Sequence, residues 1–153
     1  MRVSFDLDET LFIDPKISEI EKEFGFIWKV LYKERLRKGF LELAAELRKN
    51  KIEIWIYTTS FRSIGYIKRY FKKYGIKFDG IVNGAIHQQK VQGNKLEVQP
   101  SKYPPRFKID LHIDDDKSVK ANGDTLGFKT LILEQSDRSW TEKVLNLVKR
   151  EIT

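Results

Sequence analysis

The chain has 153 residues, of which 41% are hydrophobic and 33% are charged, as is typical of a globular domain with its own core. It contains no cysteine, which excludes disulfides and thiolate metal sites, and its two histidines argue against zinc. Any metal is therefore expected to be a hard cation held by oxygen ligands. The formal net charge of +7 favours anionic partners such as phosphates, nucleotides or nucleic acid, although the lysines are spread over several segments.

Two further features bear on where the protein works. No apolar stretch approaches the roughly 20 residues that a membrane-spanning helix needs, so we expect no membrane partner. The N-terminus runs directly into a strand-like segment with no signal peptide ahead of it. Together with the absence of cysteine, this predicts a cytoplasmic protein.

In the first half of the chain, the apolar pattern predicts strands and helices in alternation. Residues 2–7 read as a strand, and residues 16–37 carry apolar side chains at helical spacing. A helix is then predicted over 39–50, a strand over 51–57 and a helix over 64–75.

The second half of the chain continues this alternation. Residues 78–83 predict a shorter strand, and residues 84–101 predict a β-hairpin. Two more strands are predicted over 108–113 and 127–133, and a helix over 139–152 closes the chain.

Strands that alternate with helices favour parallel βαβ units. We therefore predict a single domain over residues 1–153, built as a three-layer α/β/α sandwich with a central, mainly parallel, Rossmann-like sheet. In such sheets, ligands bind beyond the carboxyl ends of the strands, near the point where the direction of the connections switches. Functional residues are thus expected directly after the strands.

Polar side chains do follow three of the predicted strands. Asp6 and Asp8 come at the end of the first strand, Thr58 after the second, and the acidic run Asp114–Asp116 after the strand over 108–113. The ends of parallel strands meet at one edge of the sheet, so these carboxylates would repel one another there. A bound Mg²⁺, which is typically held by one or two carboxylates together with a substrate phosphate oxygen, relieves that repulsion.

The chemistry that fits this arrangement is phosphoryl transfer. Asp6 can supply a carboxylate oxygen as the nucleophile and form an aspartyl-phosphate. Asp8, two residues on, is close enough to protonate the leaving oxygen and then to deprotonate the attacking water. The hydroxyl of Thr58 and a lysine would bind the transferring phosphoryl oxygens, where charge must be neutralised.

Four motifs in this order resemble those of the haloacid dehalogenase (HAD) superfamily, in its Mg²⁺-dependent phosphatase branch. They are "DLDET" from Asp6, a strand-terminal Thr at 58, a Lys upstream of the last motif, and "IDDD" ending at Asp116. The resemblance implies that Asp6 is the nucleophile and Asp8 the general acid/base. It also implies that Asp6, the backbone carbonyl of Asp8 and an acid of the last motif hold Mg²⁺. An acid at position 8 is typical of the phosphatases, because the ATPase branch usually has Thr there.

Two lysines compete for the phosphate-binding role that the resemblance implies. Lys108 lies nearer to the acids in the sequence, but it begins a strand of roughly 17 Å and should lie at the opposite edge of the sheet. Lys102 precedes "YPPRF", a short helical turn expected to lead from the catalytic edge to the start of that strand. We therefore predict Lys102 as the phosphate lysine.

The acids of the last motif differ in their implied roles. By the family's paired-acid pattern, Asp114 is the metal ligand and Asp115 orients a metal-bound water or a lysine, which leaves Asp116 as a metal neighbour or a helix cap. The third acid keeps the choice of direct ligand open. His112 lies within an apolar strand, so we expect it to pack in the core with one hydrogen bond.

The choice between Thr58 and Thr59 is close as well. Thr58 follows the strand directly and is the prediction, whereas Thr59 and Ser60 could cap the next helix.

Little of the chain is left to cover the site. Residues 13–37 could form a small helical flap, and residues 84–101 a hairpin at the rim that turns at Gly93–Asn94, but neither is long enough for a full cap domain. In the resembling proteins an open site suits macromolecular phosphoesters or is closed by a neighbouring subunit. With the positive charge, this favours a phosphorylated macromolecule, a nucleotide or a phosphosugar as substrate.

The sequence thus predicts a Mg²⁺-dependent phosphomonoester hydrolase that works through an aspartyl-phosphate on Asp6. A phosphotransferase on the same scaffold is one alternative. Another is a non-catalytic module that binds phosphate or nucleic acid, but binding alone gives no reason for the general acid at Asp8.

Overall fold

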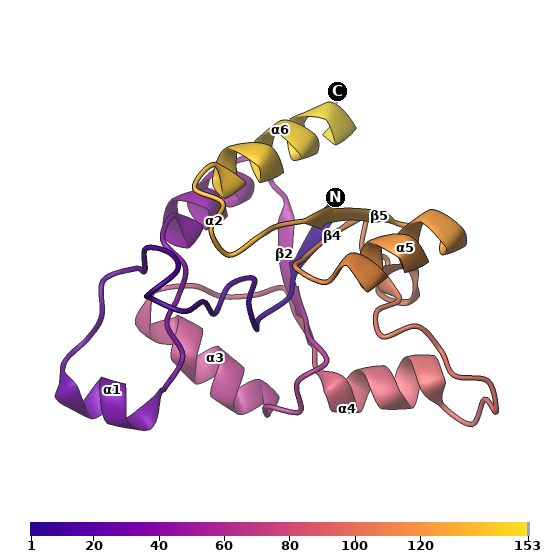
Figure 1. Ribbon diagram of the computed structural model, residues 1–153, viewed down its shortest axis with the longest axis horizontal. Coiled ribbons are helices and arrows are strands. Elements are labelled where there is room, and N and C mark those ends of the chain that lie inside the picture. The colour runs from indigo at the N-terminus through magenta and orange to yellow at the C-terminus, as the bar shows by residue number, and fades with distance from the viewer. Residues whose placement is uncertain (153) are drawn as a thin grey trace.

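The computed structural model describes residues 1–152, so residue 153, which ends the predicted domain, lies outside the described residues. A five-stranded parallel sheet forms the centre of the molecule (Figure 1). Its strands follow the order β3-β2-β1-β4-β5. Each strand overlaps one of the five predicted from the sequence. The strands are β1 (Arg2–Phe5), β2 (Glu53–Tyr57), β3 (Gly80–Val82), β4 (Leu111–Asp114) and β5 (Lys129–Ile132).

Helices cover both faces of this sheet, which confirms the predicted three-layer α/β/α sandwich. One face carries three helices whose apolar side chains join the main core: α2 (Phe40–Lys49), α3 (Ile64–Lys73) and α6 (Trp140–Ile152). The opposite face carries two short elements, α4 (Gly84–His87) and η2 (Pro104–Phe107), while α5 (Lys117–Leu126) packs against β5. Within residues 1–152, no helix is both long enough and apolar enough to cross a membrane.

The central strands are largely buried because the sheet is covered on both faces. Phe5 of β1 is fully buried, and its ring meets that of Phe40 in α2 edge to face, with 5.4 Å between ring centroids. Such packing fixes the ends of the strands relative to the helices.

The strand register aligns the residues of the site. Phe5 pairs with Ile56 of β2 on one side and with Ile113 of β4 on the other. The next residue, Asp6, donates its backbone N–H to the carbonyl oxygen of Ile113 at 2.9 Å. Asp6 and Asp114 therefore leave the sheet side by side at its carboxyl edge.

The β-hairpin predicted over residues 84–101 is wrong, because this segment begins as a helix. Asn83 caps α4 by accepting a hydrogen bond from the backbone N–H of Ile86 at 3.1 Å, and the helix continues into a π-helical turn, η1 (Gln88–Gln92). Gly93 follows with φ of +52°, a conformation that favours glycine. The glycine signal thus marks the end of a helix and not a hairpin turn.

The helical flap predicted within residues 13–37 is only partly present. Its single helix in the structure is α1 (Phe26–Leu31), and the chain returns beside itself through an antiparallel bridge between Ile20 and Arg37. Trp28 of α1 packs against Tyr70 of α3 and against Tyr74, the residue that caps the C-terminus of α3. Apolar residues at helical spacing here serve this tertiary packing, and α1 projects from the body of the molecule (Figure 1).

The caps of α5 and α3 bear on roles that the sequence left open. α5, which the sequence pattern does not assign, begins after Asp116, whose Oδ1 accepts a hydrogen bond from the backbone N–H of Ser118 at 2.7 Å. The cap role left open for Asp116 is therefore the one observed. α3 is capped by Ser63 and not by Thr59 or Ser60.

Candidate active site

The carboxyl edge of the sheet holds an open cavity of about 680 Å³ between the segments that follow β1, β2 and β4. The residues predicted for the site come together here, with the difference that Thr59 rather than Thr58 lines the cavity. The lining includes Asp6, Asp8, Thr59, Lys102, Asp114, Asp115 and Asp116.

Lys102 is the centre of the charge pattern. Its Nζ donates to Oδ1 of Asp6 at 2.8 Å and to Oδ2 of Asp114 at 2.9 Å, and the residue is only 3% exposed. Burial alone would lower the pKa of Lys102, but the two carboxylates outweigh burial and raise it. Lys102 is therefore a buried ammonium group shared by two acids.

The turn η2 accounts for the choice between the two candidate lysines. The backbone N–H of Tyr103 donates to the hydroxyl of Tyr57 at 2.8 Å, which anchors the chain beside the end of β2. Lys108 comes after η2, beside Asp110 in a hollow at the other end of the strands. The structure thus has Lys102 among the acids and Lys108 away from them.

Asp114 accepts hydrogen bonds on both carboxylate oxygens. Its Oδ1 receives the backbone N–H groups of Asp115 and Asp116 at 2.9 and 3.0 Å, and its Oδ2 receives Lys102 and His112 at 2.9 and 2.8 Å. Burial would raise the pKa of Asp114, but the hydrogen bond from His112 and the charge of Lys102 prevail and lower it. Asp114 is thus held as a carboxylate with four donors, about as many as a carboxylate can accept.

His112 packs in the core as expected, but it makes two hydrogen bonds instead of one. Its ring is fully buried, with Nε2 2.8 Å from Oδ2 of Asp114 and Nδ1 2.7 Å from the hydroxyl of Ser4. Burial lowers the pKa of His112, which favours the neutral ring. Because the carboxylate can only accept, we assign the proton to Nε2, and Nδ1 accepts from Ser4.

Asp6 ionises less readily than an ordinary aspartate. Burial raises the pKa of Asp6 to about 6, against the opposing charge of Lys102 and with a further push from the negative charge of Asp114. At neutral pH the group is still mainly a carboxylate. It is thus available as a nucleophile while it is only weakly hydrated.

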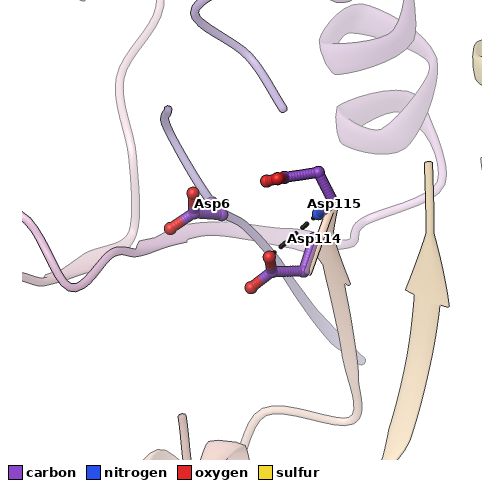
Figure 2. Close-up of side chains that lie close together, drawn as sticks. All are labelled: Asp6, Asp114 and Asp115. Atoms are coloured by element: carbon purple, nitrogen blue, oxygen red, sulfur yellow. Dashed lines mark hydrogen bonds between the residues drawn. The ribbon is translucent and has the colours of Figure 1, made fainter. Parts of the chain in front are cut away.

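Three carboxylates form a group that could hold a metal ion. Asp6, Asp114 and Asp115 each offer one oxygen, and these oxygens lie within 4.8 Å of one another (Figure 2). Asp115 is held by the hydroxyl of Thr10, which donates to its Oδ1 at 3.0 Å. Hard divalent cations prefer carboxylate oxygens, so this donor set fits Mg²⁺.

Asp114 and Asp115 differ in how free they are to bind it. Asp114 already accepts four hydrogen bonds, whereas Asp115 is only partly buried and accepts one from the side chain of Thr10. Asp115 is therefore the freer ligand, although the family pattern assigns the direct role to Asp114.

Asp8 lies in a different environment from Asp6. Its side chain is 52% exposed, and both carboxylate oxygens accept hydrogen bonds from Arg62, at 2.8 and 2.9 Å. Such two-pronged pairing fixes the plane of a carboxylate as well as its position. Asp8 is thus held at the cavity by a residue from the loop after β2.

Thr58 is buried at the end of β2 and is 1% exposed. Its hydroxyl accepts a hydrogen bond from the backbone N–H of Ser60 at 3.1 Å, which shapes the loop that presents Thr59 to the cavity. The assignment of the phosphate-binding hydroxyl to Thr58 stays a prediction.

Two residues of the site were not identified from the sequence. Arg62 lies four residues after Thr58, in the loop where functional residues are expected, so its position could have drawn attention to it. Thr10 lies within the first motif, but its partner Asp115 is 105 residues away, and no local pattern reveals that pairing.

Comparisons with known proteins show a similar fold but not a close sequence relationship. No protein-family model matches the sequence, and no curated protein matches it either. Nine chains of solved structures are similar in fold, and two of them illustrate the similarity. One is described as a predicted HAD-like family hydrolase from Porphyromonas gingivalis, with a TM-score of 0.53 and 15% identity over 96% of this chain and 97% of that one.

The second similar structure is a HAD-superfamily hydrolase, subfamily IA, variant 1, from Geobacter sulfurreducens. Its TM-score is 0.54 at 13% identity, over 86% of this chain and 88% of the other. The resemblance indicated by the sequence motifs is thus confirmed at the level of the fold: this chain has the HAD-type Rossmann-like fold.

Proposed function

We propose that this protein is a Mg²⁺-dependent phosphomonoester hydrolase of the HAD superfamily. The observation that carries the proposal is the convergence of Asp6, Asp114 and Asp115 within 4.8 Å, with Lys102 bonded to two of them at the carboxyl edge of the sheet. A purely structural role gives no reason to gather three acids where they repel one another.

In the proposed reaction, a carboxylate oxygen of Asp6 attacks the phosphorus atom of the substrate. The bond from phosphorus to the leaving oxygen breaks, and Asp8 gives that oxygen its proton. Asp8 then removes a proton from a water molecule, which attacks the phosphorus of the aspartyl-phosphate. Inorganic phosphate leaves, and the carboxylate of Asp6 and the proton on Asp8 are restored.

Asp6, Asp114 and Asp115 would hold the Mg²⁺, together with the backbone carbonyl of Asp8 that the family resemblance implies. When bound, the cation would neutralise negative charge on the phosphoryl oxygens. Lys102 and a hydroxyl of the loop after β2, from Thr58 or Thr59, would bind the same oxygens.

The open cavity supports a substrate larger than a small metabolite. It has a volume of about 680 Å³ and opens to solvent, and the only helix of the flap is the six-residue α1. A nucleotide, a phosphosugar or a phosphorylated macromolecule would fit such a site, and a second subunit could close it.

The decisive experiment measures phosphate released from 4-nitrophenyl phosphate, with Mg²⁺ and with EDTA. We expect phosphate release only with Mg²⁺. In Asp6→Asn its rate should fall by a factor of at least about 10³, because without the nucleophile only binding assists the reaction. Asp124→Asn, at an exposed acid of α5, is the matched control and should keep full activity.

Transfer of the phosphoryl group to an added alcohol in preference to water would favour the phosphotransferase. Binding of phosphate or nucleic acid without turnover, equal in wild type and Asp6→Asn, would favour the non-catalytic module and contradict the proposal.

A further inference from the structure

Asp8 is bound by a guanidinium group that has little freedom of its own. Besides its two bonds to Asp8, Arg62 donates from Nε to Oε1 of Glu34 at 3.0 Å and from one terminal nitrogen to the hydroxyl of Ser60 at 2.8 Å. Its central carbon, Cζ, lies over the ring of Phe12, 5.6 Å from the centroid. Every nitrogen of the guanidinium is thus engaged within the protein.

Glu34 and the backbone of Arg62 are held by further hydrogen bonds. The hydroxyl of Tyr66 in α3 donates to Oε2 of Glu34 at 2.6 Å, and the side chain of Glu34 is only 13% exposed. The side-chain amide of Asn83 donates to the backbone carbonyl of Arg62 at 3.0 Å. Both the side chain and the backbone of Arg62 are therefore held in place.

We propose that Arg62 and Glu34 are positioning residues for proton transfer by Asp8, an inference that rests on the proposed function. An ionised carboxylate has about four lone-pair sites, and the two bonds to Arg62 use one on each oxygen. One site on each oxygen is left, either to carry the proton that Asp8 gives to the leaving group or to accept a proton from the water. A side chain that is 52% exposed would otherwise sample several rotamers, and proton transfer requires one geometry.

The same contacts argue against a role for Arg62 in binding the substrate phosphate. Its charge is shared between Asp8 and Glu34, at 2.8 and 3.0 Å, so the pair of acids more than neutralises it. A residue that binds phosphate has donors to spare, as Lys102 would have once Mg²⁺ takes over its acids. Arg62 instead connects the flap, through Glu34, with the acid of the first motif.

The dependence of rate on the leaving group tests this role directly. A strongly basic leaving oxygen, as in glycerol 2-phosphate, needs a proton to depart, whereas 4-nitrophenolate departs almost without one. For Arg62→Gln we expect kcat on glycerol 2-phosphate to fall by about 10²-fold and kcat on 4-nitrophenyl phosphate to fall less than about 5-fold, with KM little changed. Glu34→Gln, which keeps the side-chain volume, should show the same selectivity to a smaller degree.

Three further variants complete the design. Arg62→Lys keeps the positive charge but cannot bond both oxygens of Asp8 in the same way, so it should not restore hydrolysis of the alkyl ester. In an Asp8→Asn background, Arg62→Gln should cause no further loss on that ester, because the residue through which it acts is gone. Arg69→Gln, at an exposed arginine of α3, is the control and should leave both rates unchanged.

The outcomes separate this inference from the proposed function. If the wild type hydrolyses neither ester, the proposed function fails and this inference fails with it. If the wild type hydrolyses both, but Arg62→Gln lowers both rates equally, raises KM or is rescued by lysine, then only the positioning role is overturned.

Discussion

The two acids of the first motif lie two residues apart and occupy contrasting environments. Asp6 is 6% exposed and shares a buried lysine with Asp114, and burial raises the pKa of Asp6 to about 6. Asp8 has half of its side chain in solvent and is held by Arg62. In the proposed reaction the same residue type thus serves as a weakly hydrated nucleophile at Asp6 and as an accessible proton carrier at Asp8, and the two environments suit these two roles.

The largest effect is expected in the buried half of the site, when the positive charge of Lys102, which lies between the buried acids Asp6 and Asp114, is removed. In Lys102→Met, Asp6 and Asp114 would face each other without a cation, so the free energy of unfolding without Mg²⁺ should fall by about 3 kcal/mol. Urea unfolding in EDTA measures this fall. The exposed Lys120→Met is the control and should change stability by less than about 0.5 kcal/mol.

Adding Mg²⁺ provides a second test of the same variant. A divalent cation can replace the missing ammonium group, so it should raise the melting temperature of Lys102→Met more than that of the wild type. A variant as stable as the wild type in EDTA would show that the buried half does not depend on charge compensation.

The pH dependence of stability should carry the signature of Asp6. In the metal-free protein the pKa of Asp6 is raised from 3.8 to about 6, so the folded state binds its proton more tightly than the unfolded state does. The contribution of Asp6 to stability is therefore highest below pH 4 and is lost as pH rises from about 4 to 6, by at most about 3 kcal/mol. Asp114 acts in the opposite sense, because its lowered pKa makes it stabilising above pH 4, and this contribution is lost as the pH falls further.

Urea titrations between pH 4 and 7 in EDTA would isolate the contribution of Asp6. Asp6→Asn should be more stable than the wild type at pH 7 and should lose this advantage by pH 4, while Asp124→Asn should follow the wild type throughout. A constant difference between Asp6→Asn and the wild type would contradict the raised pKa.

A smaller effect is expected at the edge of the buried half, where Asp115 is less constrained than Asp114. Asp115→Asn should weaken Mg²⁺ binding by about 10- to 100-fold in calorimetry, yet leave stability in EDTA nearly unchanged. Asp114→Asn should instead destabilise the protein, since it alters an acceptor of four hydrogen bonds. If Asp114→Asn abolishes Mg²⁺ binding with full stability, the family's assignment of Asp114 as the direct ligand is right and the distinction drawn between the two acids is wrong.

The buried half was also the more predictable from sequence. Short apolar runs fixed the five strands, and parallel pairing then fixed which residues share an edge, so Asp6 and Asp114 could be brought together from the sequence alone. Lys102 was placed beside them by the short helical turn expected after it and by the family resemblance. The pairing of Asp8 with Arg62 spans 54 residues and follows from the path of a loop, which no periodicity reveals.

The segments around the site were predicted less well for a related reason. Residues 13–37 have helical spacing, but their aromatic side chains pack on α3 and leave only α1 as a helix. In residues 84–101 a glycine was interpreted as a hairpin turn, although the Asn83 cap ten residues before it begins a helix. Local signals of this kind are ambiguous until tertiary contacts select one reading.

The smallest effect is expected at Ser60, which contacts Arg62 beside the exposed Asp8. Its hydroxyl accepts hydrogen bonds from the side chain and the backbone N–H of Arg62, at 2.8 and 3.2 Å. Ser60→Ala removes both, which should lower the free energy of unfolding by about 1 kcal/mol in urea. The fork to Asp8 and the bond to Glu34 remain, so the ratio of rates on alkyl and aryl phosphates should stay within about two-fold of the wild type. A fall in that ratio as large as in Arg62→Gln would mean that Asp8 is positioned by the loop as a whole, and the contrast between its environment and that of Asp6 would then lie in the backbone and not in one arginine.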